Sequence, residues 1–141
     1  MESFAFKRSQ RLLTSREYQR TFDRAKLRFS CPVLLVLAAE RVAPVAGQPT
    51  VQGDEQTVVP ARLGLIVAKK HLKKAVDRNR FKRISRESFR HNQTQLVGLD
   101  LIVLARAGAK NTTGQELAEL LEKSWRYIER KRRKQSSTHT E

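Results

Sequence analysis

Residues 75–90 read AVDRNRFKRISRESFR and lie between two short apolar runs, RLGLIVA at 62–68 and DLIVLA at 100–105. Short apolar runs that contain β-branched residues and end at turn residues are typical of buried strands. The segment between them carries apolar side chains at helical spacing, which predicts a helix over about 73–91. A strand, a helix and a second strand in this order predict a βαβ crossover.

Two further helices and one more strand complete the predicted order. Thr-x-x-Glu sequences at 14–17 and 113–116 are capping boxes, in which the Thr and Glu side chains each bind an amide at the start of a helix. The first predicts a helix over about 15–25, and PVLLVLAA at 32–39 predicts a buried strand. The second opens a helix with a core-facing apolar stripe made of Leu117, Leu120, Leu121, Trp125 and Ile128.

The order α-β-β-α-β-α predicts an α+β fold in which helices pack on a small mixed sheet. The 141 residues suit a single domain, which we predict over 1–134. Residues 41–61 contain three prolines and two glycines and predict a mobile loop. The polar residues 135–141 predict a disordered tail.

Positive charge is concentrated in three blocks of the sequence. The chain has 29 Lys and Arg against 14 Asp and Glu, a formal net charge of +15. Basic residues outnumber acidic ones by eight to three in 1–30, ten to two in 69–90 and six to one in 126–134. Such a surplus opposes the compact state by self-repulsion, so it indicates a polyanionic partner.

Cysteine content and hydropathy indicate a cellular compartment. Cys31 is the only cysteine, which excludes an intramolecular disulfide and a cysteine zinc cluster and favours a reducing environment. The longest apolar run, 32–39, is shorter than the roughly 20 residues that span a bilayer, and the N-terminal segment lacks the apolar region of a signal peptide. We therefore expect a cytoplasmic protein without membrane contact.

The cations of the central helix gather on one side. At 100° per residue an arc of about 140° holds Arg78, Asn79, Lys82, Arg83, Arg86 and Arg90, whereas Phe81 and Ile84 lie opposite and are expected to face the domain. Phe89 falls in the cationic arc, so either the helix distorts there or the ring is free to stack. Like-charge i,i+4 pairs, each costing about 0.2–0.5 kcal/mol, connect Arg78, Lys82, Arg86 and Arg90.

A solvated helix face and a nuclear targeting signal are alternatives for this cationic side. Solubilising faces interleave charges of both signs, and a targeting signal does not need Phe81 and Ile84 in register opposite the cations. A bound polyanion explains the pattern better. The planar guanidinium groups of the arginines match phosphate oxygens. Together with Asn79 they suit a folded nucleic acid rather than a lipid surface.

The ordered residue types of this region resemble the signature of the bacterial ribonuclease P protein component. The matching positions are Lys69-Lys70, Ala75-Val76, Arg78-Asn79-Arg80, Lys82-Arg83, Arg86-Glu87 and Phe89-Arg90. Elsewhere the chain agrees, in the same order, at Arg11-Leu12, Arg62-Leu63-Gly64 and Asp100-Leu101-Ile102-Val103. The resemblance covers residues 4 to about 130. It implies a fold like the second domain of a bacterial small-subunit ribosomal protein, with a left-handed βαβ crossover, whereas the general rule predicts a right-handed one.

The resemblance also implies a function. The family assists a catalytic RNA that hydrolytically removes 5′ leaders from precursor tRNA, with Mg²⁺ held mainly by the RNA. The expected partners are therefore the catalytic RNA subunit and precursor tRNA, with no obligate protein partner and no metal bound by the protein. By the same resemblance, the RNA subunit would be contacted by Arg78, Asn79, Arg80, Lys82, Arg83, Arg86 and Arg90.

A cleft for the single-stranded leader, between the first helix and the sheet, is implied as well. Tyr18 and Phe22 match its aromatic residues, and Lys69 and Lys70 would reach the leader backbone from the end of a strand. Spacing alone favours a core pair for Tyr18 and Phe22, and the alternative for Lys69 and Lys70 is a pair of solvated lysines. The two rings would have both roles if they packed partly in the core and kept one face open to stack on unpaired bases. Such stacking contributes about 1–3 kcal/mol per base.

The chain itself offers no convincing catalytic set. Asp54-Glu55 is the only adjacent acidic pair and falls in the predicted loop, and the histidines lie at predicted helix ends or in the tail. Protein nucleases need clustered acids for metal ions or a His-based acid and base. A ribosomal or other general RNA-binding protein, and a protein-only nuclease, remain the alternatives to a non-catalytic subunit of an RNA enzyme.

Overall fold

A four-stranded mixed sheet organises the fold in the computed structural model, which describes residues 15–40 and 61–139 and the side chains as far as residue 134. The strands are β1 (Leu27–Ser30), β2 (Leu34–Glu40), β3 (Arg62–Ile66) and β4 (Leu99–Ala105). Their order in the sheet is β1-β2-β4-β3. β2 pairs antiparallel with both β1 and β4, and β3 pairs parallel with β4. The predicted mixed sheet is confirmed, and β1 is an additional strand that the sequence did not predict.

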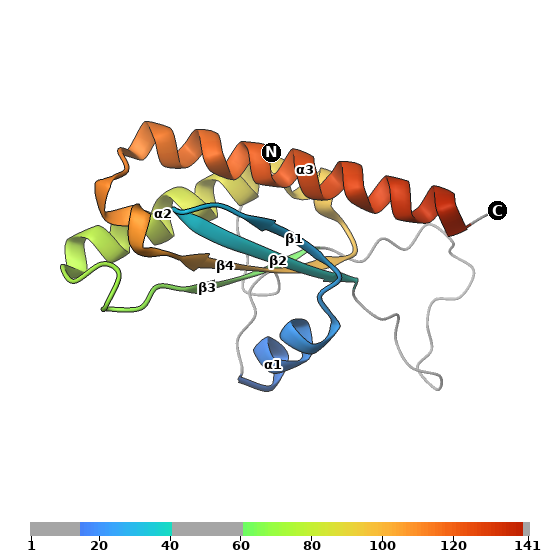
Figure 1. The fold of residues 1–141 in the computed structure, drawn as a ribbon, viewed down its shortest axis with the longest axis horizontal. Coiled ribbons are helices and arrows are strands. Elements are labelled where there is room, and N and C mark those ends of the chain that lie inside the picture. Colours follow the sequence, from blue (N-terminus) through green and yellow to red (C-terminus); the bar gives the residue numbers. More distant parts are fainter. Residues whose placement is uncertain (1–14, 41–60, 140–141) are drawn as a thin grey trace, which may run out of the picture.

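Three helices lie on the two faces of this sheet. They are α1 (Ser15–Arg24), α2 (Ala75–Asn92) and α3 (Gly114–His139), and two short 3₁₀ turns are η2 (Gln93–Leu96) and η3 (Ala107–Asn111). Figure 1 shows α1 on one face and α2 and α3 on the other. Because α2 connects the parallel strands β3 and β4, the predicted βαβ crossover is confirmed.

The helix starts and ends agree with the predictions in part. The capping box of α3 forms as predicted, since the Glu116 amide donates to Thr113 Oγ1 and the Thr113 amide donates to Glu116 Oε1, each at 3.1 Å. Thr14, which the first predicted capping box needs, lies outside the described residues, as does the predicted loop apart from the buried Ala61. α3 continues to His139, so residues 135–139 differ from the predicted disordered tail.

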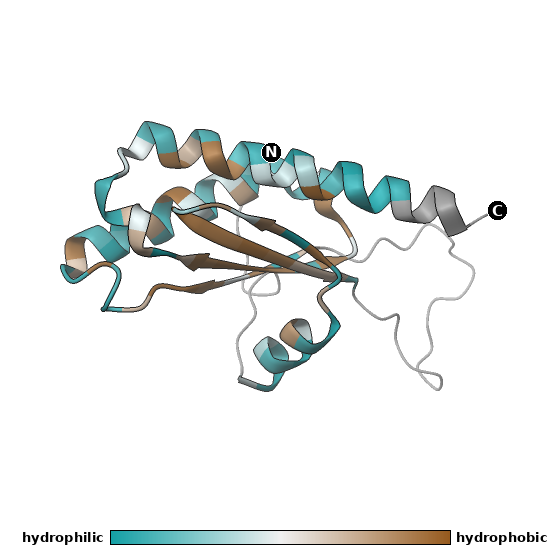
Figure 2. Ribbon diagram, in the orientation of Figure 1, coloured by the Kyte–Doolittle hydropathy of each residue, from teal (hydrophilic) through white to brown (hydrophobic). Residues whose placement is uncertain are grey.

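The main core lies between the sheet and the pair α2 and α3. The predicted apolar stripe of α3 is confirmed, with Leu117, Leu121, Trp125 and Ile128 buried and Leu120 partly buried against them. Figure 2 shows the hydrophobic strands beneath helices whose outer sides are hydrophilic. No helix in the described part of the chain is long and apolar enough to cross a membrane.

Phe89 belongs to this core and is not available to stack on RNA. Its side chain has 0% exposure, and its ring meets Trp125 edge to face, with centroids 6.2 Å apart. α2 runs without a break from Ala75 to Asn92, so no distortion places the ring there. Instead α3 packs against the side of α2 that carries Phe89. α2 is therefore buried against both the sheet and α3, and its buried surface is wider than the sheet alone would cover.

Candidate nucleic-acid interface

The outer side of α2 presents a cationic face, defined here as Asn79, Lys82, Arg83, Arg86 and Arg90. Asn79 and Arg83 are exposed, and the other three are half-buried. Within residues 15–40 and 61–134, no hydrogen bond or ion pair engages the side chains of Asn79, Lys82, Arg83 or Arg86. Their donors are therefore available to phosphate oxygens or base edges.

Arg78 and Arg80, which the family resemblance predicts as further contacts of the RNA subunit, bind backbone carbonyl oxygens of the protein itself. Arg78 Nη1 donates to the carbonyl oxygens of Leu72 (3.0 Å) and Lys73 (2.9 Å), which holds the turn that precedes α2. Arg80 Nη2 donates to the Thr112 carbonyl oxygen at 3.4 Å. Both residues thus have intramolecular partners that periodicity along one helix cannot reveal.

A shallow hollow of about 540 Å³ lies at the N-terminal end of α2. Its lining combines an apolar side chain, Val76, which is 68% exposed, with the polar side chains of Asp77, Asn79, Arg80 and Arg83. An apolar surface beside amide and guanidinium donors suits a nucleobase, whose flat face is apolar and whose edge forms hydrogen bonds. Val76 matches the family signature, but neither Val76 nor Asp77 was predicted to contact RNA.

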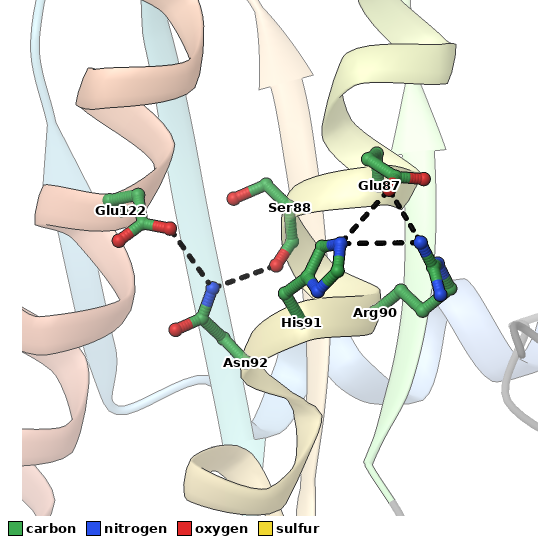
Figure 3. Close-up of polar contacts among 6 residues, drawn as sticks. All are labelled: Glu87, Ser88, Arg90, His91, Asn92 and Glu122. Carbon is green, nitrogen blue, oxygen red and sulfur yellow. Dashed lines mark hydrogen bonds and ion pairs between the residues drawn. The ribbon is translucent and has the colours of Figure 1, made fainter. Parts of the chain in front are cut away.

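At the other end of α2, one carboxylate oxygen of Glu87 contacts the side chains of both Arg90 and His91. Arg90 Nη2 donates to Glu87 Oε2, and His91 Nε2 lies 3.0 Å from the same oxygen (Figure 3). These hydrogen bonds hold the pKa of the Glu87 carboxyl below its ordinary value, and the bond from Arg90 has the largest effect. Arg90 therefore lies in a fixed position at the end of the cationic face.

The opposite side of α2 is locked to α3 by buried polar contacts, which fixes the direction of the cationic face. Trp125 Nε1 donates to Ser88 Oγ at 2.8 Å. Asn92 Nδ2 donates to the Ser88 carbonyl oxygen at 2.8 Å and reaches Glu122 Oε2 at 3.4 Å (Figure 3). Buried directional contacts of this kind set the rotation of a helix about its axis.

Tyr18 anchors α1 to the edge of the sheet. The Leu65 amide donates to Tyr18 Oη at 3.0 Å, and Tyr18 Oη donates to the Leu65 carbonyl oxygen at 3.4 Å. The ring lies so close to Gly64 that a Cβ at that position would approach its atoms to 2.7 Å. Gly64 is therefore needed for this close approach, and Tyr18 is half-buried rather than freely exposed.

A charged network lies beside this anchor. Arg62 Nε and Nη2 donate to the two carboxylate oxygens of Asp100 at 2.9 and 2.8 Å, and Arg62 Nη1 reaches Glu17 Oε2 at 3.2 Å. Hydrogen bonding to Asp100 raises the pKa of Arg62 above its ordinary value. The network ties α1 to β3 and β4 and borders a pocket of about 250 Å³ between α1 and the sheet.

The same sheet face carries an apolar row that α1 leaves partly open. Leu35 pairs with Leu104, and Leu104 pairs with Ile66, so these residues cross three strands on one face. Gly64, two residues before Ile66 on β3, lies under Tyr18 on that same face. All three apolar residues are half-buried and lie outside the main core cluster. Sequence reasoning missed them, because β2 and β4 are apolar at consecutive positions.

The remaining predicted leader-binding residues border this face. Phe22 is 38% exposed on α1. Lys69 and Lys70 are exposed in the turn that follows β3, beyond the end that carries Ile66. The structure therefore divides the predicted aromatic pair into an anchor, Tyr18, and an exposed ring, Phe22.

The side chains that the structure describes form no catalytic metal centre. In residues 15–40 and 61–134, no three or more His, Cys, Asp or Glu side chains gather closely enough to hold a metal ion. Asp54 and Glu55 lie outside the described residues.

Comparison with known proteins identifies one family throughout. The ribonuclease P family model matches residues 6–129. The ribonuclease P protein component of Vibrio campbellii is 39% identical over 132 residues, which cover 92% of this chain and 97% of that protein. The corresponding protein of Saccharophagus degradans is 38% identical over 138 residues, covering 98% of this chain and 91% of that protein.

Solved structures of similar proteins share the fold. The RNase P protein of Staphylococcus aureus is 25% identical with a TM-score of 0.65, covering 83% of this chain and 93% of that one. The RNase P protein from Thermotoga maritima is 25% identical with a TM-score of 0.55, covering 80% of this chain and 96% of that one.

Proposed function

This chain belongs to the ribonuclease P family, as the protein component of the ribonucleoprotein endonuclease that processes tRNA, and on that premise we propose a binding partner for each of its two surfaces. The cationic face of α2 binds the catalytic RNA subunit. The open side of the sheet beside α1 binds the single-stranded 5′ leader of precursor tRNA. Both partners are polyanions, as the net charge of +15 favours.

The single observation that carries the first assignment is the set of side chains on α2 that lack intramolecular partners. Lys82, Arg83 and Arg86 direct their charge away from the core, and no described side chain neutralises them. Arg86 lies four residues before Arg90, and such like-charge neighbours are tolerated most easily when an external anion lies against them. Arg78 and Arg80, through their backbone contacts, would shape this face more than they would bind RNA.

The leader assignment rests on a different chemistry. Unpaired bases present flat apolar faces, and the half-buried row of Leu35, Leu104 and Ile66 offers a matching surface on the sheet face that α1 flanks. Phe22 adds an exposed ring on α1 for stacking. Lys69 and Lys70 lie at the end of this row, where leader phosphates would meet them. Tyr18 would act by holding α1 in place and by limiting the width of the cleft.

The chemical step would belong to the RNA. Mg²⁺ would be held mainly by the RNA subunit, with the protein contributing binding and orientation of the substrate in the cytoplasm. We propose no obligate protein partner besides this chain. The protein would favour precursor over mature tRNA, because only the precursor carries the leader.

Reconstitution tests the proposal. Precursor tRNA is incubated in Mg²⁺ with a bacterial ribonuclease P RNA, with this protein, and with both. We expect leader removal at low salt to be fastest with both together and to be absent with the protein alone. Cleavage by the protein alone, or no effect of the protein on the RNA, would contradict the assignment.

Arg83→Ala tests the α2 face within the same system. Loss of one phosphate contact should weaken binding of the RNA subunit and reduce the log-log salt slope by about one. Lys26→Ala is the matched control, because Lys26 is an exposed cation between α1 and β1, away from α2. Equal slopes for the two variants would remove Arg83 from the interface.

A further inference from the structure

From Lys123 to Lys134, α3 carries a second cationic surface that the two proposed sites do not use. It is defined here as the outward α3 face, and its members are Lys123, Arg126, Arg130, Arg133 and Lys134. All five are exposed. At 100° per residue they fall within an arc of about 100°, and they extend over about 16 Å along the helix axis.

After Ile128, α3 extends beyond the hydrophobic core. Ile128 is the last buried side chain among the residues described as far as 134. Arg132 then fastens the helix to the body of the domain, since its Nη1 and Nη2 donate to the carbonyl oxygens of Val97 (2.6 Å) and Gln95 (3.0 Å). The turns after Ile128 are therefore held by Arg132 on one side and present cations on the other.

Three cations of this face, Lys123, Arg126 and Arg130, have no partner among the described residues. Arg126, Arg130 and Lys134 are spaced i,i+4, an arrangement that destabilises a helix by about 0.2–0.5 kcal/mol per pair when unscreened. Arg133 meets Glu129 at 3.8 Å, a long and exposed ion pair. Within residues 15–40 and 61–134, no hydrogen bond or ion pair engages the side chains of Lys123, Arg126 or Arg130.

Acidic side chains on the same helix lie beside this face or before it. Glu116 caps the start of α3, and Glu119 lies 3.5 Å from Gln115, one turn before Lys123. Glu122 points toward Asn92 of α2 (Figure 3). The outward α3 face is therefore cationic from Lys123 onward.

We propose that the outward α3 face binds the phosphate backbone of the catalytic RNA subunit as a second site, in addition to the cationic face of α2. The inference rests on the proposed function of α2. α2 and α3 cover the same face of the sheet, whereas α1, beside which we propose that the leader binds, lies on the opposite face (Figure 1). An RNA held by α2 thus extends along the helical layer that contains α3, and a leader beside α1 does not.

The test compares charge-removing variants in binding of the labelled RNA subunit across a series of salt concentrations. In the double variant Arg126→Gln/Arg130→Gln, the log-log salt slope should fall by about two, one for each phosphate contact. Binding near 0.15 M salt should weaken at the same time. The double variant Lys26→Gln/Lys110→Gln removes the same charge from exposed sites elsewhere and is the matched control.

Three further measurements make the result decisive. Arg126→Lys/Arg130→Lys retains the charge and should keep the parental slope, and circular dichroism should give equal helicity for all variants. A single-stranded leader oligonucleotide should bind both glutamine double variants equally. A slope for Arg126→Gln/Arg130→Gln equal to that of the control would overturn the α3 site.

Arg83→Gln separates this failure from failure of the proposed function. If Arg83→Gln lowers the slope and the α3 variant matches its control, α2 binds the RNA subunit and the α3 inference is wrong. If neither variant lowers the slope, the assignment of the helical layer to the RNA subunit is wrong, and with it the α3 inference.

Discussion

The two faces of the sheet are built from the same apolar strands but are covered very differently. On the face beneath α2 and α3, Val36, Leu101 and Val103 have 0% exposure and belong to the main core cluster. On the face beside α1, Leu35 and Leu104 remain half-buried. Two long helices cover the first face, and the ten-residue α1 covers only part of the second. The first face stabilises the fold, and the second retains apolar surface for a ligand.

The largest expected effect is the loss of stability when a leucine of β4 is replaced by alanine on the closed face. Leu101 and Leu104 lie three residues apart, on opposite faces of the sheet. Leu101→Ala should lower the free energy of unfolding by about 2–5 kcal/mol, because it leaves a cavity in a closed core. Leu104→Ala, its matched control, should cost only about 1 kcal/mol, since water already reaches that side chain. Urea unfolding followed by circular dichroism measures both. Equal losses would mean that the two faces contribute alike to stability.

Next in size is the charged network that holds α1 on the open face. Arg62→Ala leaves Asp100, whose exposed fraction is 7%, without its bidentate partner. We expect a loss of about 2 kcal/mol, since the site is only partly shielded from water. Arg28→Ala on β1 is the control for an exposed strand cation and should cost less than about 0.5 kcal/mol. A similar loss in the two variants would show that the network adds no stability.

Phe22 tests whether the open face binds the leader. Phe22→Ala should weaken binding of precursor tRNA to the reconstituted holoenzyme about tenfold, as expected for loss of one stacking contact. Binding of mature tRNA should be unchanged. Val76→Ala removes an exposed apolar side chain from α2 and should not alter the ratio of the two affinities. An unchanged ratio for Phe22→Ala would remove this ring from the leader cleft.

The smallest effect concerns the closed face and has the opposite sign. Ser85 is fully buried, and its hydroxyl has no hydrogen-bond partner in the described part of the chain. Ser85→Ala should therefore raise the free energy of unfolding by about 1 kcal/mol. Ser88→Ala, one turn later, should lower it, because Ser88 Oγ accepts from Trp125 Nε1. A loss of stability in Ser85→Ala would indicate that the hydroxyl does have a partner in solution.

Much of the helical layer could be predicted from local pattern. The Thr113 capping box, the apolar stripe of α3 and the cationic side of α2 all depend on spacings of three or four residues, which helix geometry converts directly into contacts or shared faces. The parallel pair of β3 and β4 followed from the order of the elements. The short strand β1 escaped prediction, because its four residues carry too little periodicity to stand out.

Contacts between distant segments could not be predicted in the same way. Arg78 and Arg80 share the residue type of Arg83, yet both bind backbone carbonyl oxygens that only the folded chain brings near. Tyr18 and Phe22 share one face of α1, yet only Tyr18 meets the edge of β3. Phe89 falls in the cationic arc of an isolated helix and is buried by a helix that follows more than twenty residues later in the chain.

By itself the sequence determined the family, the α+β class, the cationic side of α2 and the excess of positive charge, because these depend on residue type and short-range spacing. The tertiary structure decided which arginines are free to bind, which aromatic ring is an anchor and which sheet face stays open. These properties depend on packing between segments distant in the chain. Their partners come into contact only when the sheet has formed and the helices have settled on its two faces.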